Sequence, residues 1–259
     1  GIFNHEGYIS MTDCNIMNNI EYNIENGDSG GGIYFDVNSE GLMNNCSIRG
    51  NSATGNGGGI YVEDADLECN NSTIYDNQSD AYGGGIYIEE TAIELCNVTF
   101  GKNTADNDGN HLYEGTNGSS DFKCDYIGIL NDDLTVDQFD SWRSGESLYC
   151  YTQGTGRLIG GTASSVTFSL GTPHLGNTPL VITAPTGNTF GAAVVDYKAD
   201  LIALNFPSLC YWDITHVTGS DPADLDMIYL KSNVEARHGD MTIASYVFHR
   251  DGNSWTNIT

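Results

Sequence analysis

The sequence predicts an all-β fold, with a parallel β-helix over residues 1–120 and an antiparallel β-sandwich or barrel over residues 121–259. Two motifs that recur in phase predict the β-helix. One is a glycine-rich corner before an apolar–aromatic pair, as at residues 57–61, which read GGGIY. The other ends in asparagine, as at residues 74–77, which read IYDN. Motifs that keep step at a fixed period of about 20–50 residues indicate a solenoid.

The period follows from the first apolar residue of each motif. In the first motif this residue lies at Ile2, Ile33, Ile60, Ile86 and Leu112. In the second motif it lies at Ile16, Ile48, Ile74 and Phe100. The spacings are 31, 27, 26 and 26 residues for the first motif and 32, 26 and 26 for the second. We therefore expect stacked turns of this length, with neighbouring strands about 4.8 Å apart.

Alternation along each strand predicts which side chains point into the coil. Two further inward columns are expected, at Met11, Met43, Cys69 and Leu95 and at Cys14, Cys46, Ser72 and Val98. The glycine triplets allow the positive φ of a sharp corner, although the copy at residues 109–113 has decayed to GNHLY. Stacked amides are expected to form a hydrogen-bonded ladder at another corner, made of Asn19, Asn51, Asn77 and Asn103.

Two outward columns are the candidate sites of the repeat. One carries the carboxylates Asp36, Glu63 and Glu89. Like charges on neighbouring strands repel, so either a cation such as Ca²⁺ binds them or they form a solvated acidic face. The other column carries the aromatic residues Phe3, Tyr34, Tyr61, Tyr87 and Tyr113. It is either an exposed surface that binds sugar rings or a partner, or a cross-strand ladder that stabilises the sheet.

The charge balance excludes one class of partner. The chain has 35 acidic and 9 basic residues and a formal net charge of −26. Nucleic-acid binding needs clustered Lys and Arg, so no nucleic-acid partner is expected. No stretch approaches the roughly 20 apolar residues that span a bilayer, so membrane insertion is not expected either. Acidity and the type of repeat together predict an extracellular protein at the cell surface.

The sequence contains seven cysteines, and their positions predict which are free and which form disulfides. Cys14 and Cys46 stack in one inward column, within the roughly 4.4–6.8 Å between Cα atoms that a disulfide requires. The parallel, in-register geometry nevertheless favours free buried thiols. Cys150 and Cys210 are the disulfide candidate, which leaves Cys124 for an intermolecular bond. No Cys-x-x-Cys occurs, so nothing indicates zinc.

Sequons make glycosylation a further expectation. Asn-x-Ser/Thr occurs at Asn45, Asn70, Asn71, Asn77, Asn97, Asn117 and Asn257. Chains rich in Asn, Ser and Thr also produce such matches by chance, so both explanations stay open.

The repeat fades after Tyr113, and the polar residues 115–125 suggest a boundary. Gly, Pro, Asn and Asp then separate alternating segments at intervals of about 10 residues, which is typical of an antiparallel sandwich or barrel. The expected strands are residues 147–151, 165–170, 180–183, 192–197, 201–206, 227–230 and 241–249. Residues 245–255 are read as a hairpin with an Asp-Gly turn.

The pairing of Gly-Gly-(Gly/Ala)-Ile with (Phe/Ile)-x-x-Asn resembles the repeat of the polymorphic outer-membrane proteins of chlamydial type. It is also similar to the adhesin-like β-helix proteins of archaeal and bacterial surfaces. The resemblance covers residues 1 to about 115 and does not extend further. It implies a secreted, right-handed β-helix that serves as a stalk or an adhesive surface.

These observations predict an adhesin-like stalk, or a subunit that self-associates end to end or laterally into a filament, sheath or layer. Carbohydrate or other surface proteins are the further partners expected. Because residue 1 falls inside a repeat motif, we expect that preceding chain or another subunit covers this open strand edge. A β-helix polysaccharide lyase or hydrolase and a viral receptor-binding spike stay open. No residue is nominated as catalytic, and the six histidines are expected to be surface or structural residues.

Overall fold

The computed structural model describes most of the first half of the chain and shorter segments of the second. The described residues are 1–22, 30–123, 126–135, 149–161, 164–173, 176–177, 180–183, 186–196, 210–218, 224–227, 248–251 and 254–257. They contain strands and turns without an α-helix, so the all-β class is confirmed for them. No helix long and apolar enough to cross a membrane occurs in this part of the chain. The chain divides into two units, Gly1–Tyr229 and Leu230–Thr259.

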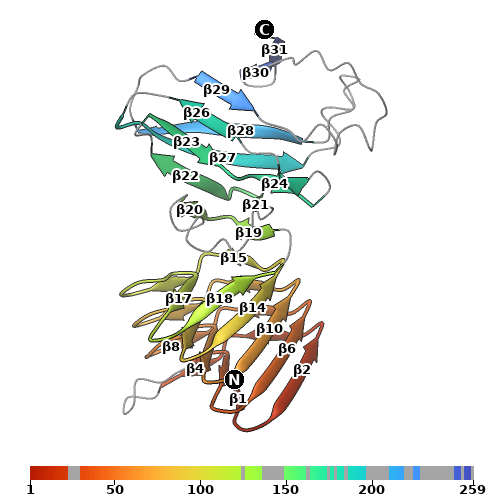
Figure 1. The fold of residues 1–259 in the computed structure, drawn as a ribbon, viewed down its shortest axis with the longest axis vertical. Coiled ribbons are helices and arrows are strands. Elements are labelled where there is room, and N and C mark those ends of the chain that lie inside the picture. Colours follow the sequence, from red (N-terminus) through yellow and green to blue (C-terminus); the bar gives the residue numbers. More distant parts are fainter. Residues whose placement is uncertain are drawn as a thin grey trace. The chain divides into compact units, whose positions relative to one another are not determined.

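The first half is a parallel β-helix of about four turns, in which each full turn gives one strand to each of four parallel sheets (Figure 1). Sheet A contains β1 (Ile2–Asn4), β5 (Ile33–Phe35), β9 (Ile60–Glu63), β13 (Ile86–Glu89) and β17 (Leu112–Glu114). Sheet B contains β2 (Tyr8–Thr12), β6 (Glu40–Asn44), β10 (Asp66–Asn70), β14 (Ala92–Cys96) and β18 (Ser119–Phe122).

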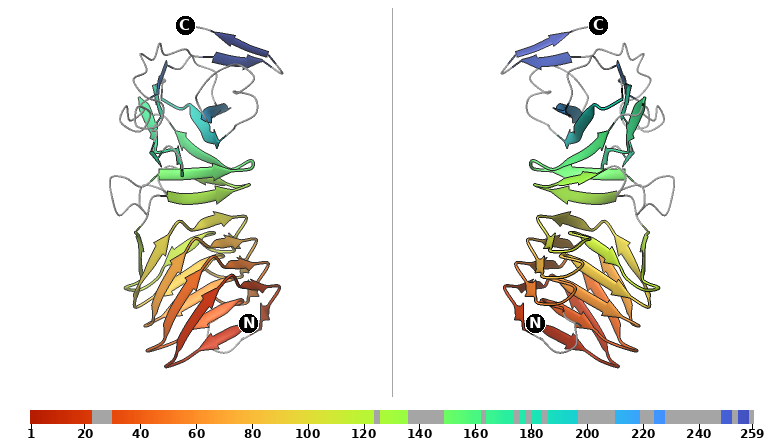
Figure 2. Two further views of the ribbon diagram at one scale, coloured as in Figure 1. Left: turned by 90° about the vertical axis from the view of Figure 1, so that its right-hand side faces the viewer. Right: turned by 90° about the vertical axis from the view of Figure 1, so that its left-hand side faces the viewer.

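The other two sheets follow the second motif and the corner after it. Sheet C contains β3 (Asn15–Met17), β7 (Ser47–Arg49), β11 (Thr73–Tyr75), β15 (Thr99–Gly101), β19 (Tyr126–Leu130) and β21 (Tyr149–Gln153). Sheet D contains the two-residue strands β4 (Ile20–Glu21), β8 (Ser52–Ala53), β12 (Gln78–Ser79) and β16 (Thr104–Ala105). Figure 2 shows these turns stacked one above another.

The register confirms the predicted columns. Ile60 pairs with Ile33 on one side and with Ile86 on the other. Cys69 pairs in the same way with Met43 and Leu95. The inward side chains of these columns are buried, except that Ile2 in the first turn is partly buried, and one hydrophobic core runs through the coil into the strands beyond it. Apolar side chains one period apart therefore supply the burial that holds the turns together.

The glycine triplets serve two physical needs at the corner before sheet A. Gly57 and Gly83 have φ of 68° and 66°, a region that side chains other than glycine rarely adopt. The second glycine, Gly58, lies against the next turn, where an added Cβ would be 2.3 Å from the carbonyl oxygen of Gln78. The positive φ expected at these corners is confirmed, and the close backbone approach explains why a second glycine follows.

Parallel pairing continues past residue 120. β19 pairs with both β15 and β21, so sheet C reaches Gln153. β20 (Asp133–Thr135) then pairs in parallel with β22 (Arg157–Gly161). β22 then pairs antiparallel with β27 (Thr189–Asp196), and β27 pairs antiparallel with β28 (Cys210–Thr218). A single parallel bridge joins Leu170 to Cys150. The predicted division at residue 120 stays a prediction.

The remaining described strands form small antiparallel sheets. β26 (Leu180–Thr183) lies between β23 (Ser165–Phe168) and β29 (Asp224–Met227). β24 (Gly171–Thr172) pairs with β25 (Gly176–Asn177). Antiparallel pairing is thus confirmed where it is described, whereas closure into a sandwich stays a prediction. The strand expected at residues 201–206 lies outside the described residues.

The second unit contains the predicted hairpin. β30 (Phe248–Asp251) and β31 (Ser254–Asn257) pair antiparallel, with Asp251 opposite Ser254. The connecting residues 252–253 lie outside the described residues, as do residues 241–247.

Candidate functional site

The aromatic column forms a continuous ladder on sheet A. Its members, Phe3, Tyr34, Tyr61, Tyr87 and Tyr113, pair in register across the five strands. The centroids of successive rings are 5.3, 4.8, 5.1 and 5.6 Å apart. Tyr82, from the corner before β13, adds a ring 4.6 Å from that of Tyr113. These distances are typical of aromatic pairs that stabilise a fold.

The middle of this ladder is buried. Tyr61 is 0% and Tyr87 is 7% exposed, whereas Phe3 at the end is 64% exposed. Tyr61 is enclosed because the rings of Tyr34 and Tyr87 pack on its two sides. The predicted exposed binding surface of Tyr34, Tyr61, Tyr87 and Tyr113 is therefore wrong for its two central members, which a ligand cannot reach. The alternative, a stabilising cross-strand ladder, describes these two rings.

The carboxylates predicted to bind a metal are hydrogen-bonded to the tyrosine ladder. The hydroxyl of Tyr34 donates to Oε2 of Glu63 at 2.6 Å. The hydroxyl of Tyr61 donates to Oε2 of Glu89 at 2.9 Å. Each tyrosine thus reaches a carboxylate one turn further along the coil. Hydrogen bonds to a charged acceptor are stronger than neutral ones, so they tie adjacent turns together.

The third carboxylate of that column has different partners. Oδ2 of Asp36 lies 2.8 Å from Nδ1 of His5, and its Oδ1 accepts from the backbone N–H of Val37 at 2.8 Å. Among the described residues, no three His, Cys, Asp or Glu side chains gather closely enough to hold a metal ion. Asp36, Glu63 and Glu89 thus do not gather into such a group in the described structure, and each carboxylate has a donor of its own. Calcium binding at this column stays a prediction.

The predicted asparagine ladder is formed, and its middle members use all their hydrogen-bonding groups. Oδ1 of Asn77 accepts from N and Nδ2 of Asn51 at 3.0 and 2.9 Å. Nδ2 of Asn77 donates to Oδ1 of Asn103 and to the carbonyl of Ile48, both at 2.9 Å. Asn51 receives the same pair of bonds from Asn19. Asn77 is 1% exposed, so water cannot replace these bonds.

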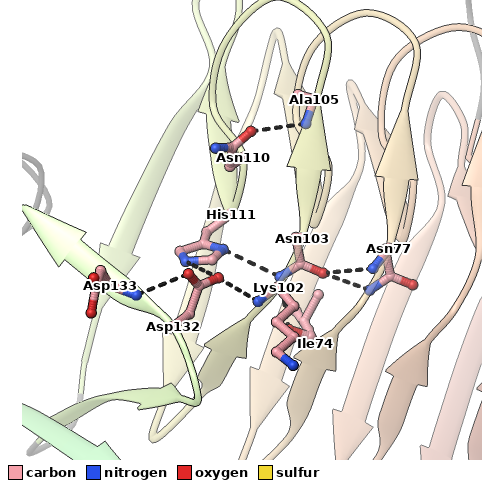
Figure 3. Close-up of polar contacts among 9 residues, drawn as sticks. All are labelled: Ile74, Asn77, Lys102, Asn103, Ala105, Asn110, His111, Asp132 and Asp133. Carbon is pink, nitrogen blue, oxygen red and sulfur yellow. Dashed lines mark hydrogen bonds and ion pairs between the residues drawn. The ribbon is translucent and has the colours of Figure 1, made fainter. Parts of the chain in front are cut away.

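The ladder ends on a histidine instead of a further asparagine (Figure 3). Nδ1 of His111 lies 3.4 Å from Nδ2 of Asn103, and Nε2 lies 3.6 Å from Oδ2 of Asp132. The ring also stacks on Phe100 with a centroid distance of 5.9 Å. An amide nitrogen only donates, so Nδ1 is the acceptor and the ring proton lies on Nε2, facing the carboxylate.

The environment of His111 favours this neutral ring. The side chain is 6% exposed, and burial lowers its pKa below the ordinary value of 6.5 by disfavouring the imidazolium, while the charge of Asp132 acts in the opposite direction. Burial also raises the pKa of Asp133. The charge of Asp132 raises this pKa further, and the charge of Arg157 lowers it. A proton on Nδ1 would remove the acceptor that Asn103 requires.

At the same end of the coil, a carboxylate takes the place of a backbone carbonyl as a hydrogen-bond acceptor. In the turn below, the N–H of Asp76 donates to the carbonyl of Gly101 at 2.9 Å. One period later the N–H of Lys102 donates to Oδ2 of Asp132 (Figure 3). The side chain of Asp132 therefore occupies the position that the next turn's backbone occupies elsewhere.

In sheet D the side chain of Asn110 likewise serves as an acceptor for a backbone N–H. β16 is the last strand of that sheet among the described residues. The N–H of Ala105, in β16, donates to Oδ1 of Asn110 at 2.9 Å. A side-chain oxygen thus satisfies an edge-strand donor.

We call Asn110, His111 and Asp132 the cap. The GNHLY copy at residues 109–113 looked decayed in the sequence, yet its two polar residues are the ones that close the last full turn. Polar residues in place of the second and third glycines were the signal that could have revealed this role. Asp132 was missed as well, although it lies three residues after Ile129, which pairs with Phe100, and so holds the position of the ladder asparagines. His111 confirms the expectation of a structural histidine.

The cysteines differ in part from the prediction. Cys14, Cys46 and Cys69 carry free thiols, as expected. Cys150 is also free and buried, so the predicted disulfide between Cys150 and Cys210 is not formed. Burial in the core raises the pKa of the Cys150 thiol and keeps it protonated. Cys96, which the sequence did not single out, is disulfide-bonded. Cys124 lies outside the described residues.

Three of the sequons have a structural explanation in the repeat. Asn45, Asn71 and Asn97 occupy the same corner between sheets B and C, with φ of 54°, 49° and 54°. Asparagine is one of the few residues that tolerates this left-handed region. Asn77 is buried in the ladder, which leaves no room for a glycan on its amide. Glycosylation at Asn45, Asn70, Asn71, Asn97 and Asn117 stays a prediction, and Asn257 has no described side chain.

An acidic row that the sequence analysis missed lies on the outer face of sheet B. Glu68 pairs with Glu94 across β10 and β14, and Glu94 pairs with Asp121 across β14 and β18. Lys123 forms ion pairs with Glu94, at 3.5 Å, and with Asp121. The lysine relieves part of the repulsion between stacked carboxylates. The side chains of Glu94, Asp121 and Lys123 are 55%, 42% and 46% exposed, so they form a solvated charged face.

Comparison with known proteins supports the repeat and leaves its biological type open. Residues 1–126 match the family model described as a right handed beta helix region. The match covers slightly less than half of the 259 residues. No curated protein and no solved structure matches the chain. Residues 1–126 are thus similar to right-handed β-helix proteins, which include both adhesive and polysaccharide-active types.

Proposed function

We propose that this protein is an extracellular structural protein of the cell surface, in which the β-helix serves as an adhesin-like stalk. The observation that carries the proposal is the internal use of the repeated polar side chains. The asparagine ladder bonds to itself, and the ladder tyrosines bond to carboxylates of the next turn. Each turn reproduces the contacts of the one before, which suits an element whose purpose is length and rigidity.

Self-association into a filament, sheath or layer is the second part of the proposal. Its support lies in the first turn, where Phe3, Tyr8, Ile20 and Tyr22 are exposed. Exposed apolar side chains gathered on one turn suit burial against another copy of the chain. Closure of the antiparallel strands beyond residue 153 into a sandwich, which would form the distal domain of the stalk, belongs to the same proposal.

Electron microscopy and solution mass of the purified protein test assembly. Filaments, sheets or a concentration-dependent mass support it, and dispersed monomers at every salt and calcium concentration contradict it. A reducing-sugar assay across plant, algal and bacterial polysaccharides tests the structural role itself. Release of sugar ends by the protein would overturn that role in favour of a polysaccharide-active enzyme.

A further inference from the structure

Two free cysteines lie in register on the first two turns. Cys14 and Cys46 each occupy the corner between sheets B and C. The pairs that flank them are Thr12 with Asn44 and Asn15 with Ser47, and the N–H of Ser47 donates to the carbonyl of Cys14 at 2.8 Å. In-register neighbours on parallel strands are about 4.8 Å apart. This spacing lies inside the roughly 4.4–6.8 Å range of Cα separations in disulfides.

The two thiols point into the same corner. Each donates to the carbonyl two residues earlier, Cys14 to Thr12 at 3.3 Å and Cys46 to Asn44 at 3.4 Å. Cys46 also reaches the carbonyl of Met11 at 3.6 Å. Burial raises the pKa of the Cys46 thiol, and the side chain of Cys14 beside it adds to that rise. The column continues with Ser72, so only these two turns place one cysteine over another at this corner.

The solvent exposure of Cys14 and its stacking on a second cysteine distinguish this pair from the other thiols. Cys14 is partly exposed, whereas Cys46 and Cys69 are buried. Burial also raises the pKa of Cys69 to about 12, and its neighbours in register are Met43 and Leu95, so no cysteine stacks on it. Cys96 of the same chain is already in a disulfide. A chain that carries a disulfide belongs in a compartment where further thiol pairs oxidise.

We propose that Cys14 and Cys46 form a redox-active pair that closes a disulfide between the first and second turns, with a small-molecule disulfide such as oxidised glutathione as the oxidant. The thiolate of Cys14 attacks one sulfur of the small disulfide and releases one small thiol. The thiolate of Cys46 then attacks Sγ of Cys14 and releases the second small thiol. The two protons lost by the cysteines go to the released thiolates. Two cysteines are oxidised and one small disulfide is reduced.

The bond would fasten the first described turn to the second. A covalent link from Cys14 to Cys46 closes a loop through strands β3 to β6, and a closed loop restricts the unfolded chain. The oxidised first turn is therefore expected to be harder to open than the reduced one.

Peptide mapping by mass spectrometry tests the proposal on the full-length protein. The native protein is incubated with oxidised glutathione, alkylated, and digested with a protease specific for acidic residues. The expected result is one cross-linked species that joins the peptides of Cys14 and Cys46, with loss of both free thiols. In Cys46→Ser, Cys14 should instead retain glutathione. Cys69→Ala is the matched control, in which the cross-link should form as in the unsubstituted protein.

Three outcomes would overturn the proposal. One is a stable glutathione adduct on Cys14 of the unsubstituted protein without the cross-link. Another is a cross-link from Cys46 to Cys69, and the third is no reaction at Cys14. Limited proteolysis adds a second measurement, because the oxidised protein should be cleaved more slowly within its first turn than Cys14→Ser under the same conditions. Equal cleavage rates would contradict the fastening role.

Discussion

In the full turns the N–H of Asp76 donates to the backbone of Gly101, whereas in the last turn the N–H of Lys102 donates to the side chain of Asp132. The asparagine ladder shows the same contrast. Asn77 is bonded to asparagines on both sides, and Asn103 ends against His111. A repeat can delegate its hydrogen bonds to the next copy only where that copy follows the same backbone path. Beyond β15 sheet C continues with β19 and β21, but the interval lengthens to 29 residues between Phe100 and Ile129, and side chains supply the acceptors there.

The space around the glycine corner explains why the second and third positions of the motif hold glycine in the full turns but Asn110 and His111 in the copy at residues 109–113. An added Cβ on Gly58 would lie 2.3 Å from a backbone oxygen of the following strand in sheet D. At the equivalent position, Asn110 instead faces the edge strand β16 and bonds to it. Likewise, a Cβ on Gly85 would lie 3.2 Å from Nδ2 of Asn103, and the residue one period later is His111, which bonds to that same amide.

The largest effect should come from breaking the ladder in its middle. Asn77→Ala removes the acceptor for the backbone N–H and the side-chain amide of Asn51, and it removes the donor to the carbonyl of Ile48. Oδ1 of Asn103 loses one of its two donors and keeps the backbone N–H of residue 77. Each unsatisfied buried group costs about 1–3 kcal/mol, so the free energy of unfolding should fall by about 4 kcal/mol. Urea unfolding measures this. Asn19→Ala, at the partly exposed end of the ladder, is the matched control and should cost about 1 kcal/mol.

A comparably large effect is expected at the second glycine of a full turn. Gly58→Ala forces a methyl group against the carbonyl oxygen of Gln78, which is backbone and cannot rotate away. Overpacking of this kind costs about 1–3 kcal/mol, and the upper end is expected. Asn110→Ala, at the same position in the repeat, loses only the bond to Ala105 and should cost about 1 kcal/mol. Equal losses in urea unfolding would show that the two corners do not differ.

The cap should make stability depend on pH. Burial holds the pKa of His111 below 6.5 in the folded protein. As pH falls below this value, the unfolded chain binds the proton first, so the free energy of unfolding decreases. The contribution is fully present above the unfolded pKa and is lost as pH falls through 6.5 toward the folded pKa.

His111→Asn keeps an acceptor for Asn103 and removes the titrating ring. The difference in urea midpoint between the protein and this variant should therefore change over about pH 8 to about pH 5 and follow the sign above. A constant difference over that interval would mean that His111 is not buried as a neutral ring.

The smallest effect is expected from the loss of a single hydroxyl group in the tyrosine ladder. Tyr61→Phe keeps the stacked ring and loses only the hydrogen bond to the partly exposed Glu89. The free energy of unfolding should fall by about 1 kcal/mol. Tyr61→Ala, which removes a fully buried ring, should cost about 3–5 kcal/mol. If the two variants were equally stable, the ring itself would not support the sheet.

Periodicity accounts for what the sequence predicted well. Residues at a constant spacing must stack, so the apolar columns, the glycine corners and the asparagine ladder all followed from the period. Alternation alone placed Tyr61 outward but could not show that neighbouring rings bury it. It could not reveal that Glu63 and Glu89 accept tyrosine hydroxyls either. Asp132 was missed because the interval lengthens to 29 residues between Phe100 and Ile129, and because an aspartate stands where the other turns have asparagine.

Amide hydrogen exchange at Lys102 and Ala105, followed by NMR, tests most directly whether the last turn is closed by side chains. Both amides should be protected in the unsubstituted protein, as that of Asp76 should be in the turn below. Lys102 should lose protection in Asp132→Ala and Ala105 in Asn110→Ala, each without the other. Exchange of both amides at the unprotected rate in the unsubstituted protein would contradict the account of the cap.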